Sequence, residues 1–234
     1  MSGYMKSLQA ALEGLGWGPG PIDGVFGPAT AAAAAAFAGS ERGVPPTPEP
    51  APPIGKRLAI VVGHTLRAPG ATRVVDGVPE YEWNMDLADR IRRYALQAGV
   101  DCSVFLRDEN LGYAAQIEKV YGKADSWGAD ATVELHFNAS SVASATGTET
   151  LHSGSARSKA FASAVQGRML AALGLRSRGT FKPAVRGLKS LITGRAPAIL
   201  IEPYFGSNPK DCAAADGGKD QLASAIIEGF LEAF

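Results

Sequence analysis

The chain has 234 residues, of which 46% are hydrophobic and 20% charged, as in ordinary globular proteins. Its 23 basic and 23 acidic side chains give zero formal net charge, which argues against nucleic acid as the main partner, because phosphate binding normally shows as a basic excess. No apolar run approaches the roughly 20 residues that a membrane helix needs, so we expect no membrane insertion.

The N-terminal stretch MSGYMKSLQAALEG lacks the apolar core and small-residue cleavage site of a secretory signal. We therefore expect a protein made in the cytoplasm, which would need another delivery route to reach a target beyond the membrane. The two cysteines, Cys102 and Cys212, are too few for a disulfide framework and are expected to be buried or free thiols.

Residues 1–38 have the pattern of a small helical module. Leu8, Leu12 and Leu15 recur at helical spacing, and the glycine that follows them can end the helix. The turn-rich stretch GWGPGPIDGVFGP leads to a second, Ala-rich helix expected over residues 30–38. So short a unit has little core, and we expect marginal stability.

Residues 39–55, GSERGVPPTPEPAPPIG, are rich in proline and poor in large apolar side chains. Such a segment stays extended and acts as a semi-rigid spacer. The sequence therefore predicts three parts: a helical module over residues 1–38, a linker over 39–55 and a larger domain over 56–234.

The larger domain alternates strand-like and helix-like segments. This alternation, with strands that are apolar along their whole length, predicts an α/β sheet covered by helices on both faces. Strands are expected over residues 57–63, 101–106, 131–137, 147–151 and 198–203, and helices over 80–98, 113–127, 158–173 and 219–233.

Polar residues collect where these strands end. His64 and His136 each close a predicted strand, a third strand ends on Glu202, and Glu80 opens the first long helix. Chemistry in α/β sheets gathers at the carboxyl ends of strands. Two imidazoles and one carboxylate, with a fourth position left to water, are the ligands that catalytic zinc needs. Spacing alone leaves open the alternative that these histidines are hydrogen-bonded structural residues.

In the N-terminal part, LQAAL, IDGVFGPAT and the closing Phe37 resemble the peptidoglycan-binding type 1 module over residues 4–38. The resemblance implies a three-helix fold and peptidoglycan as the partner. Exposed Tyr4 and Trp17 are the candidate wall-binding residues, whereas the apolar residues of the pattern build the core. The chain departs from the family at its end, where Ala38 replaces the usual glutamine.

In the larger domain, VVGH, PEYEWNMDLADRI, VELHFN, GTETL and ILIEPYFGSNPKD follow one another along the chain. In this order they resemble the N-acetylmuramoyl-L-alanine amidases of the amidase 3 type, over residues 57–232. The family pattern is DPGHGG, a glutamate opening a helix, SIHAN, G-x-E-x-Y and VETGFLSN. The resemblance implies a twisted, mostly parallel sheet and zinc-dependent hydrolysis of the amide between N-acetylmuramic acid and L-alanine.

Carried over residue by residue, the family's zinc ligands fall on His64, Glu80 and His136, and its catalytic glutamate falls on Glu202. Glu80 is preferred to Glu82 because an asparagine follows it by four residues, as in the family. The expected reaction is metal-assisted amide hydrolysis with Glu202 as general base and then general acid.

Four other polar residues lie near these motifs. Asn138 is a candidate substrate-binding residue, and both a hydrogen bond that supports the metal site and a turn cap remain open for it. Glu134 shares a strand face with His136 and either supports the site or pairs with a base. His152 is expected to be structural or solvent-facing, and Arg107 to form a structural ion pair.

The loop after His64 must differ from the family, because VVGHTL replaces DPGHGG. Two alternatives to the amidase remain: a zinc endopeptidase or carboxypeptidase of the stem peptide, and a wall-binding protein without catalysis. The setting expected is a phage endolysin released from the host cytoplasm through a holin, with a bacterial autolysin as the alternative. A monomer is favoured.

Overall fold

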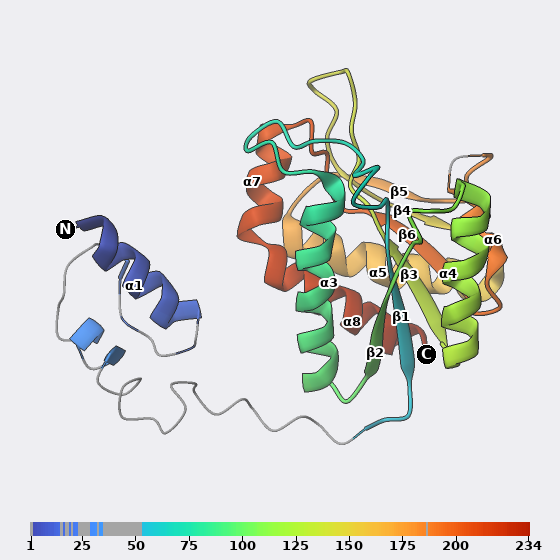
Figure 1. Cartoon of the computed structure of the whole chain (residues 1–234), viewed down its shortest axis with the longest axis horizontal. Helices are drawn as coiled ribbons and strands as arrows, with labels where there is room; N and C mark the ends of the chain where they lie inside the picture. The colour runs from blue at the N-terminus through green and yellow to red at the C-terminus, as the bar shows by residue number, and fades with distance from the viewer. Residues whose placement is uncertain are drawn as a thin grey trace. The chain divides into compact units, whose positions relative to one another are not determined.

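The computed structural model describes residues 2–14, 16, 19, 21–22, 29–31, 33–34, 53–185 and 187–234, with side chains from residue 6 onward. The chain divides into two compact units, residues 1–49 and residues 50–234. Figure 1 labels the helices and strands of both units.

The N-terminal unit is helical where it is described. Helix α1 spans Ser2–Gly14, and residues 29–31 and 33–34 are also helical. Leu12 is buried, and the buried amide of Gln9 donates hydrogen bonds to the Pro21 carbonyl (2.9 Å) and to Thr30 Oγ1 (3.1 Å). The first bond ties helix α1 to the stretch that follows it, and the second ties it to the start of the next helical segment. The rest of the expected second helix, most of the turn-rich stretch before it and most of the proline-rich linker lie outside the described residues.

The C-terminal unit is built on one six-stranded sheet with the strand order β2-β1-β3-β6-β4-β5. Strands β2, β1, β3 and β6 are parallel, and β4 runs antiparallel to β6 and parallel to β5. The prediction of a mostly parallel α/β sheet is confirmed. The strands are β1 Arg57–Val62, β2 Asp101–Leu106, β3 Ala131–Leu135, β4 Thr148–His152, β5 Ser177–Phe181 and β6 Ala198–Glu202.

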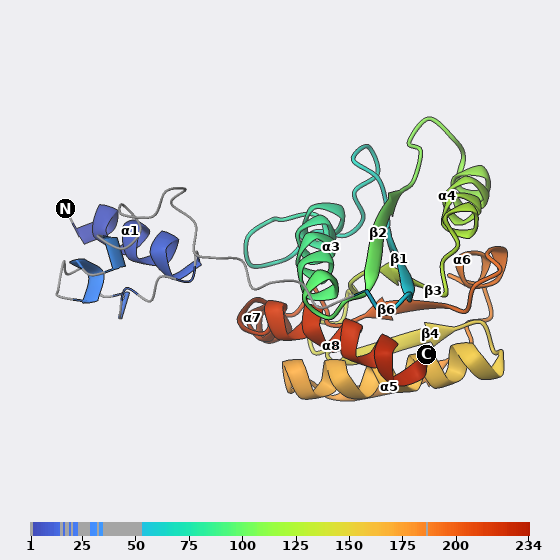
Figure 2. The same ribbon diagram turned by 90° about the horizontal axis from the view of Figure 1, so that it is seen from below.

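Helices cover both faces of this sheet, as Figure 2 shows. Helices α3 (Glu80–Gln97), α5 (Ala156–Leu173) and α8 (Lys219–Ala233) pack on one face. Helices α4 (Tyr113–Trp127) and α6 (Leu188–Thr193) pack on the other. The central strands are mostly apolar because both of their faces are buried, and the exceptions include Thr132, Glu134 and Glu202. None of the described helices has both the length and the apolar character needed to cross a bilayer.

Three elements of this unit were not predicted: β5, α6 and α7 (Pro209–Gly217). Strand β5 has the sequence SRGTF, lies at the sheet edge and is largely exposed, so it shows no apolar alternation. Helix α6 is only six residues long. Helix α7 has a start signal, since the Asn208 side chain caps it and proline follows, but its short polar sequence has no apolar period.

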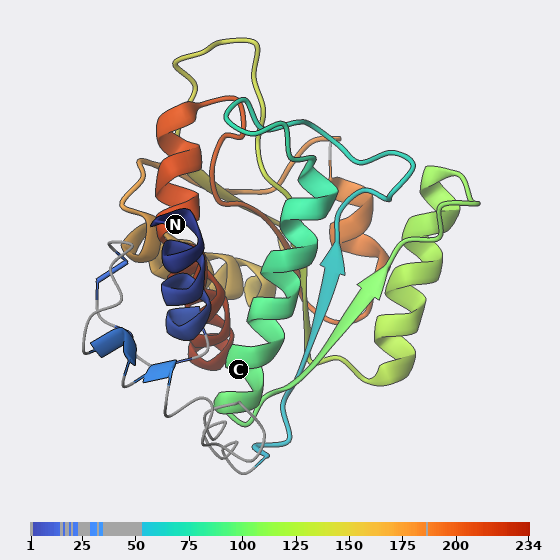
Figure 3. The ribbon, with the colours of Figure 1, turned by 60° about the vertical axis from the view of Figure 1, so that its left-hand side comes forward.

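The loop from β1 to α3 is fastened to α7, beside which it passes in Figure 3. The guanidinium of Arg73 donates two hydrogen bonds to the carboxylate of Asp216, at 2.8 and 2.6 Å. The Val74 amide donates to the Gly206 carbonyl (2.9 Å). Because the Arg73 side chain is only 3% exposed, this bidentate pair anchors the loop that leads to Glu80.

Both cysteines are free thiols, Cys212 buried and Cys102 partly so.

Candidate active site

His64 lies two residues beyond Val62, the last residue of β1, at the carboxyl edge of the sheet. Its φ of 67° lies in the left-handed region that residues with a side chain rarely adopt. The preceding Gly63 still pairs with the neighbouring strand, because its amide donates to the Leu135 carbonyl (3.0 Å). The turn thus occurs at His64 itself and directs the imidazole across the sheet edge toward α3. Strained backbone of this kind is typical of functional positions.

Glu80 is the first residue of α3 and is buried, with 2% of its surface exposed. Its carboxylate accepts hydrogen bonds from the amides of Phe137 (3.1 Å) and Ala71 (3.2 Å). Glu82, the other acidic residue of the first turn, is exposed. The helix therefore presents Glu80, and not Glu82, to the two histidines.

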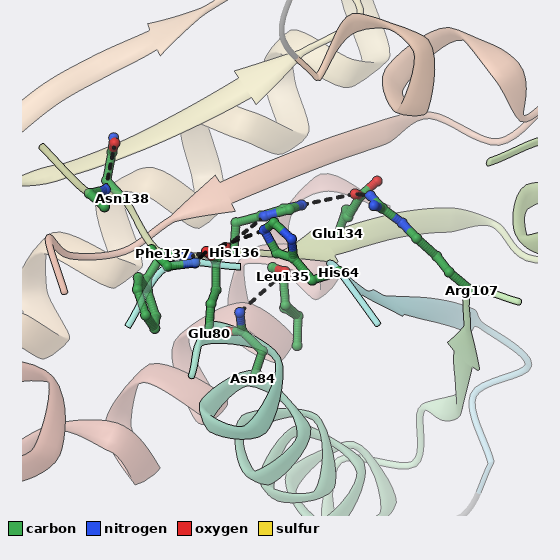
Figure 4. A network of polar contacts seen from close by, with 11 residues as sticks. His64, Glu80, Asn84, Arg107, Glu134, Leu135, His136, Phe137 and Asn138 are labelled. Carbon is green, nitrogen blue, oxygen red and sulfur yellow. Dashed lines mark hydrogen bonds and ion pairs between the residues drawn. The ribbon is translucent and has the colours of Figure 1, made fainter. Parts of the chain in front are cut away.

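The three residues converge on one point (Figure 4). Nε2 of His64 lies 3.2 Å from Oε2 of Glu80, and Nδ1 of His136 lies 2.8 Å from Oε1 of Glu80. The two imidazole rings meet edge to face with centroids 4.9 Å apart. One ligand atom from each of the three side chains lies within 4.8 Å of the others.

This donor set fits a zinc ion. Zinc binds imidazole nitrogen and carboxylate oxygen at about 2.0–2.2 Å with tetrahedral geometry, which separates neighbouring ligand atoms by roughly 3.3 Å. The distances of 2.8 and 3.2 Å from Glu80 are close to that separation. Three protein ligands leave a fourth position for water, as in catalytic rather than structural zinc sites.

The buried charges of the cluster shift each other's pKa values. Burial would raise the pKa of Glu80, but the hydrogen bonds from His136 and His64 outweigh it and lower the pKa to about 2. Burial would lower the pKa of His136, but its contacts with Glu134 and Glu80 raise the pKa to about 10. The metal-free cluster is therefore a buried carboxylate paired with an imidazolium, and a divalent cation can replace the proton.

Two glycines make room for the cluster. A Cβ atom on Gly63 would lie 2.4 Å from Cε1 of His136. A Cβ atom on Gly70, which has a φ of +84°, would lie 2.7 Å from Glu80 Oε2 and from His64 Cδ2. Both glycines are needed for the close approach of backbone to ligand side chains.

A cleft of about 520 Å³ opens beside the cluster, and His64 and His136 line it. Glu202, the last residue of β6, lines the same cleft and is 4% exposed. The His136 amide donates to the Ile201 carbonyl (3.1 Å), so the end of β6 lies directly beside the histidine. A carboxylate that lines the same cleft as a candidate cation site is a candidate general base.

A second buried network adjoins His136. Glu134 is fully buried; it accepts hydrogen bonds from the Tyr121 hydroxyl (2.7 Å) and from Arg107, and its Oε1 lies 3.0 Å from Nε2 of His136. Burial opposes ionisation, but the Arg107 guanidinium and His136 hold the pKa of Glu134 well below its usual range. Arg107 forms an ion pair, as its position suggested, and its partner is Glu134.

The remaining candidates lie apart from the cluster. Asn138 donates from its side chain to Glu149 (2.7 Å) and is not among the described residues that line the cleft. His152 is buried on β4, where Thr150 of the same strand face contacts α5, so it lies on the face opposite the cleft. The side chain of Tyr4 and the whole of Trp17 lie outside the described residues.

Sequence reasoning missed several residues of the site. Glu149 accepts hydrogen bonds from Asn138 and from Arg178 Nε (2.5 Å), and it pairs across the sheet with Glu202. Glu149 belongs to the motif GTETL, which could have marked it as a site residue. The antiparallel pairing of β4 with β6, which places Glu149 beside Glu202, could not be predicted from the sequence. Gly63 was readable as a small residue before His64, whereas Gly70 lies in a loop without a motif.

Comparison with known proteins is consistent across the chain. A family model described as N-acetylmuramoyl-L-alanine amidase matches residues 58–232, and one described as a peptidoglycan binding domain matches residues 3–45. The N-acetylmuramoyl-L-alanine amidase LytC of Bacillus subtilis (strain 168) is 32% identical over 183 residues, which are 76% of this chain. The match spans 35% of the length of LytC.

Solved structures share the fold of the C-terminal unit. The catalytic domain of the CD27L endolysin targeting Clostridia Difficile is 26% identical with a TM-score of 0.64, covering 75% of this chain and 97% of that domain. The N-acetylmuramoyl-L-alanine amidase from Clostridium difficile 630 is 26% identical with a TM-score of 0.65, covering 75% and 95%. The catalytic domain of CwlV from Bacillus (Paenibacillus) polymyxa has the same fold, with a TM-score of 0.66 at 24% identity, covering 76% of this chain and 97% of that chain.

Proposed function

The chain belongs to the family of N-acetylmuramoyl-L-alanine amidases, and from this premise we propose that it is a zinc-dependent peptidoglycan hydrolase. Its substrate bond is the amide between the lactyl group of N-acetylmuramic acid and L-alanine of the stem peptide. The observation that carries the proposal is the convergence of His64, Glu80 and His136 within 4.8 Å, in a cleft that Glu202 also lines.

In this proposal His64, Glu80 and His136 hold the metal. Zinc bound there would lower the pKa of a water molecule toward about 7 and polarise the scissile carbonyl. The hydrogen bonds from the Phe137 and Ala71 amides hold the Glu80 carboxylate between the two imidazoles. The protein thus supplies a preformed site with little reorganisation on binding.

Glu202 would carry the protons of the reaction. Its carboxylate would accept a proton from the attacking water, and the hydroxide so formed would attack the carbonyl carbon of the lactyl group. The C–N bond then breaks, and Glu202 returns the proton to the leaving amine of L-alanine. One residue can serve as base and then acid because the two steps are sequential.

The N-terminal unit would bind the cell wall. Its match to a peptidoglycan binding domain supports this role, and the parts proposed are the module over residues 1–38, the linker over 39–55 and the catalytic domain over 56–234. A weak binding module tethered to an enzyme raises the local concentration of an insoluble substrate. Tyr4 and Trp17 remain the proposed wall contacts.

The experiment is digestion of purified peptidoglycan followed by mass spectrometry of the products. The amidase proposal expects intact stem peptides that begin with free L-alanine and glycan strands that keep the lactyl carboxylate. A chelator should abolish the release, and added zinc should restore it. Cleavage within the stem peptide would instead identify a peptidase, and metal-independent binding without products would identify a wall-binding protein.

We further propose that the biological role is lysis of a bacterial host by a phage. The likeness to the catalytic domain of the CD27L endolysin supports this, and the family also contains bacterial enzymes such as LytC. Expression inside bacteria should cause lysis only when a holin is expressed with it. Lysis without a holin would favour an autolysin that reaches the wall by its own route.

A further inference from the structure

Glu134 is a fully buried carboxylate that neither the proposed metal ligation nor the proposed proton transfer uses. It lies two residues before His136, so the two side chains project from the same face of the sheet. Its Oε1 lies 3.0 Å from Nε2 of His136, whereas the other ring nitrogen, Nδ1, faces Glu80 (Figure 4). The imidazole is therefore held between two carboxylates, one on each nitrogen.

Glu134 is itself fixed in place. The Tyr121 hydroxyl donates to its Oε2 at 2.7 Å, and the Arg107 guanidinium donates to its Oε1. Tyr121 is 1% exposed, and the Arg107 side chain is 6% exposed and lies over the Tyr113 ring. A carboxylate saturated by these donors is suited to orient a neighbour rather than to exchange ligands.

The backbone at Gly63 also restricts rotation of the His136 ring. Gly63 lies against the Cε1–Nε2 edge of His136, so closely that an added Cβ would be 2.4 Å from Cε1 and 2.5 Å from Nε2. The ring is packed on this edge and bonded at Nε2 to Glu134. Only Nδ1 is directed toward Glu80 and the other ligand atoms.

We propose that Glu134 is a positioning residue, which accepts a hydrogen bond from Nε2–H of His136 and thereby turns Nδ1 toward the metal. This proposal rests on the proposed function, since it requires zinc in the cluster. An acceptor on the second nitrogen fixes the tautomer and orientation of a metal-binding histidine, and its removal weakens metal binding about 10–100-fold. The family pattern SIHAN has serine at this position, so the carboxylate is a feature of this chain.

The test is the zinc dissociation constant of the full chain, measured at one pH by competition with a chelating dye. For Glu134→Gln, which loses the charge but keeps one weaker acceptor oxygen, we expect zinc binding about tenfold weaker, the low end of the effect of losing such a partner. The zinc concentration that gives half-maximal activity should rise by the same factor. The matched control is Glu149→Gln, which removes one carboxylate from the same cleft but contacts Asn138 and Arg178 instead of His136. It should change the zinc affinity far less.

Glu134→Gln leaves the charge of Arg107 in a buried place, which can destabilise the fold. The double variant Arg107→Met, Glu134→Leu removes both members of the ion pair and should bind zinc at least as weakly as the single variant. Metal-free thermal unfolding reports any loss of stability separately. In the zinc-loaded wild type, ¹⁵N spectra of the imidazoles should place the His136 proton on Nε2.

The outcomes separate the two proposals. Equal zinc affinity in the wild type, in Glu134→Gln and in the double variant would overturn the role of Glu134 and leave the amidase proposal intact. A His136 proton on Nδ1 in the zinc-loaded protein would also overturn it. A wild-type chain that binds no zinc would overturn both proposals.

Discussion

Gly70 lies against the carboxylate of Glu80: a Cβ atom at position 70 would be 2.7 Å from Oε2 of that residue. The loop that carries Gly70 is anchored to α7 by the bidentate pair of Arg73 and Asp216, so it cannot withdraw freely. The cluster of His64, Glu80 and His136 is thus closed on one side by backbone.

Gly70→Ala should therefore damage the metal site. The added methyl group would collide with Glu80 and His64, and we expect zinc affinity to fall by more than tenfold. Gly77→Ala is the matched control, because Gly77 is in the same loop at a φ of +74° but, its chain neighbours aside, no atom of the described residues lies within 4 Å of its Cβ position. Both variants carry the left-handed strain of about 1–2 kcal/mol. Equal zinc affinity in the two would show that the contact at Gly70 is unimportant.

Glu202→Gln should separate catalysis from metal binding. Loss of a general acid–base carboxylate is expected to lower kcat by about two to four orders of magnitude. Zinc affinity should stay near the wild-type value, because Glu202 does not belong to the described cluster of ligand atoms. Measurement of kcat and of bound zinc in the same preparation checks this. Loss of zinc from the variant would mean that Glu202 is a ligand instead.

The sequence predicted those residues of the candidate site that lie at the ends of strands. His64, His136 and Glu202 were placed at strand ends, and the sheet brings strand ends together at one edge. Glu80 required the family pattern, because a glutamate at a helix start is common as a partner of the helix dipole. Burial of Glu80 and exposure of Glu82 then distinguished the two acids in the structure.

Zinc binding should depend steeply on pH. With the pKa of His136 raised to about 10 in the metal-free protein, its imidazole is protonated at pH 7, and zinc must displace that proton. We expect the apparent affinity to rise by about tenfold per pH unit between about pH 7 and 8.5, with release of about one proton. Calorimetry in buffers of different ionisation enthalpy counts the protons. An affinity that is constant over this range would contradict the pairing of His136 with two carboxylates.

The same shift affects the stability of the metal-free protein. The pKa of His136 is raised above its ordinary value of 6.5, so the protonated imidazole stabilises the folded state. This contribution to the free energy of unfolding is complete below pH 6.5. It is lost as the pH rises through about 10, so the metal-free protein should unfold at lower temperature in alkaline than in neutral solution. Zinc should reduce this difference, since it replaces the proton.

Deletion of residues 1–55 should lower activity on whole cell walls more than on soluble wall fragments. The reason is that a tethered binding module raises the effective concentration only of an insoluble substrate. Turbidity loss of walls and release of peptide from fragments give the two rates. An equal loss on both substrates would indicate that the N-terminal unit supports the fold of the catalytic domain instead.

What the sequence could not predict depends on contacts across the sheet. Glu134 was ambiguous because the same strand face served equally well for support of His136 and for an ion pair, and the structure has both. Strand β4 was expected, but its antiparallel pairing with β6, which sets Glu149 beside Glu202, follows from the chain path rather than from local residues. No motif marks Gly70, because glycine is required there by contacts with the side chains of Glu80 and His64, which are not its neighbours along the chain.

The most direct test of the account is the position of zinc in a crystal of the full chain or its catalytic domain, located by anomalous scattering. We expect one peak within about 2.0–2.2 Å of His64 Nε2, a Glu80 carboxylate oxygen and His136 Nδ1. A zinc ion bound elsewhere, or no peak at this cluster in crystals grown with zinc, would contradict the central claim.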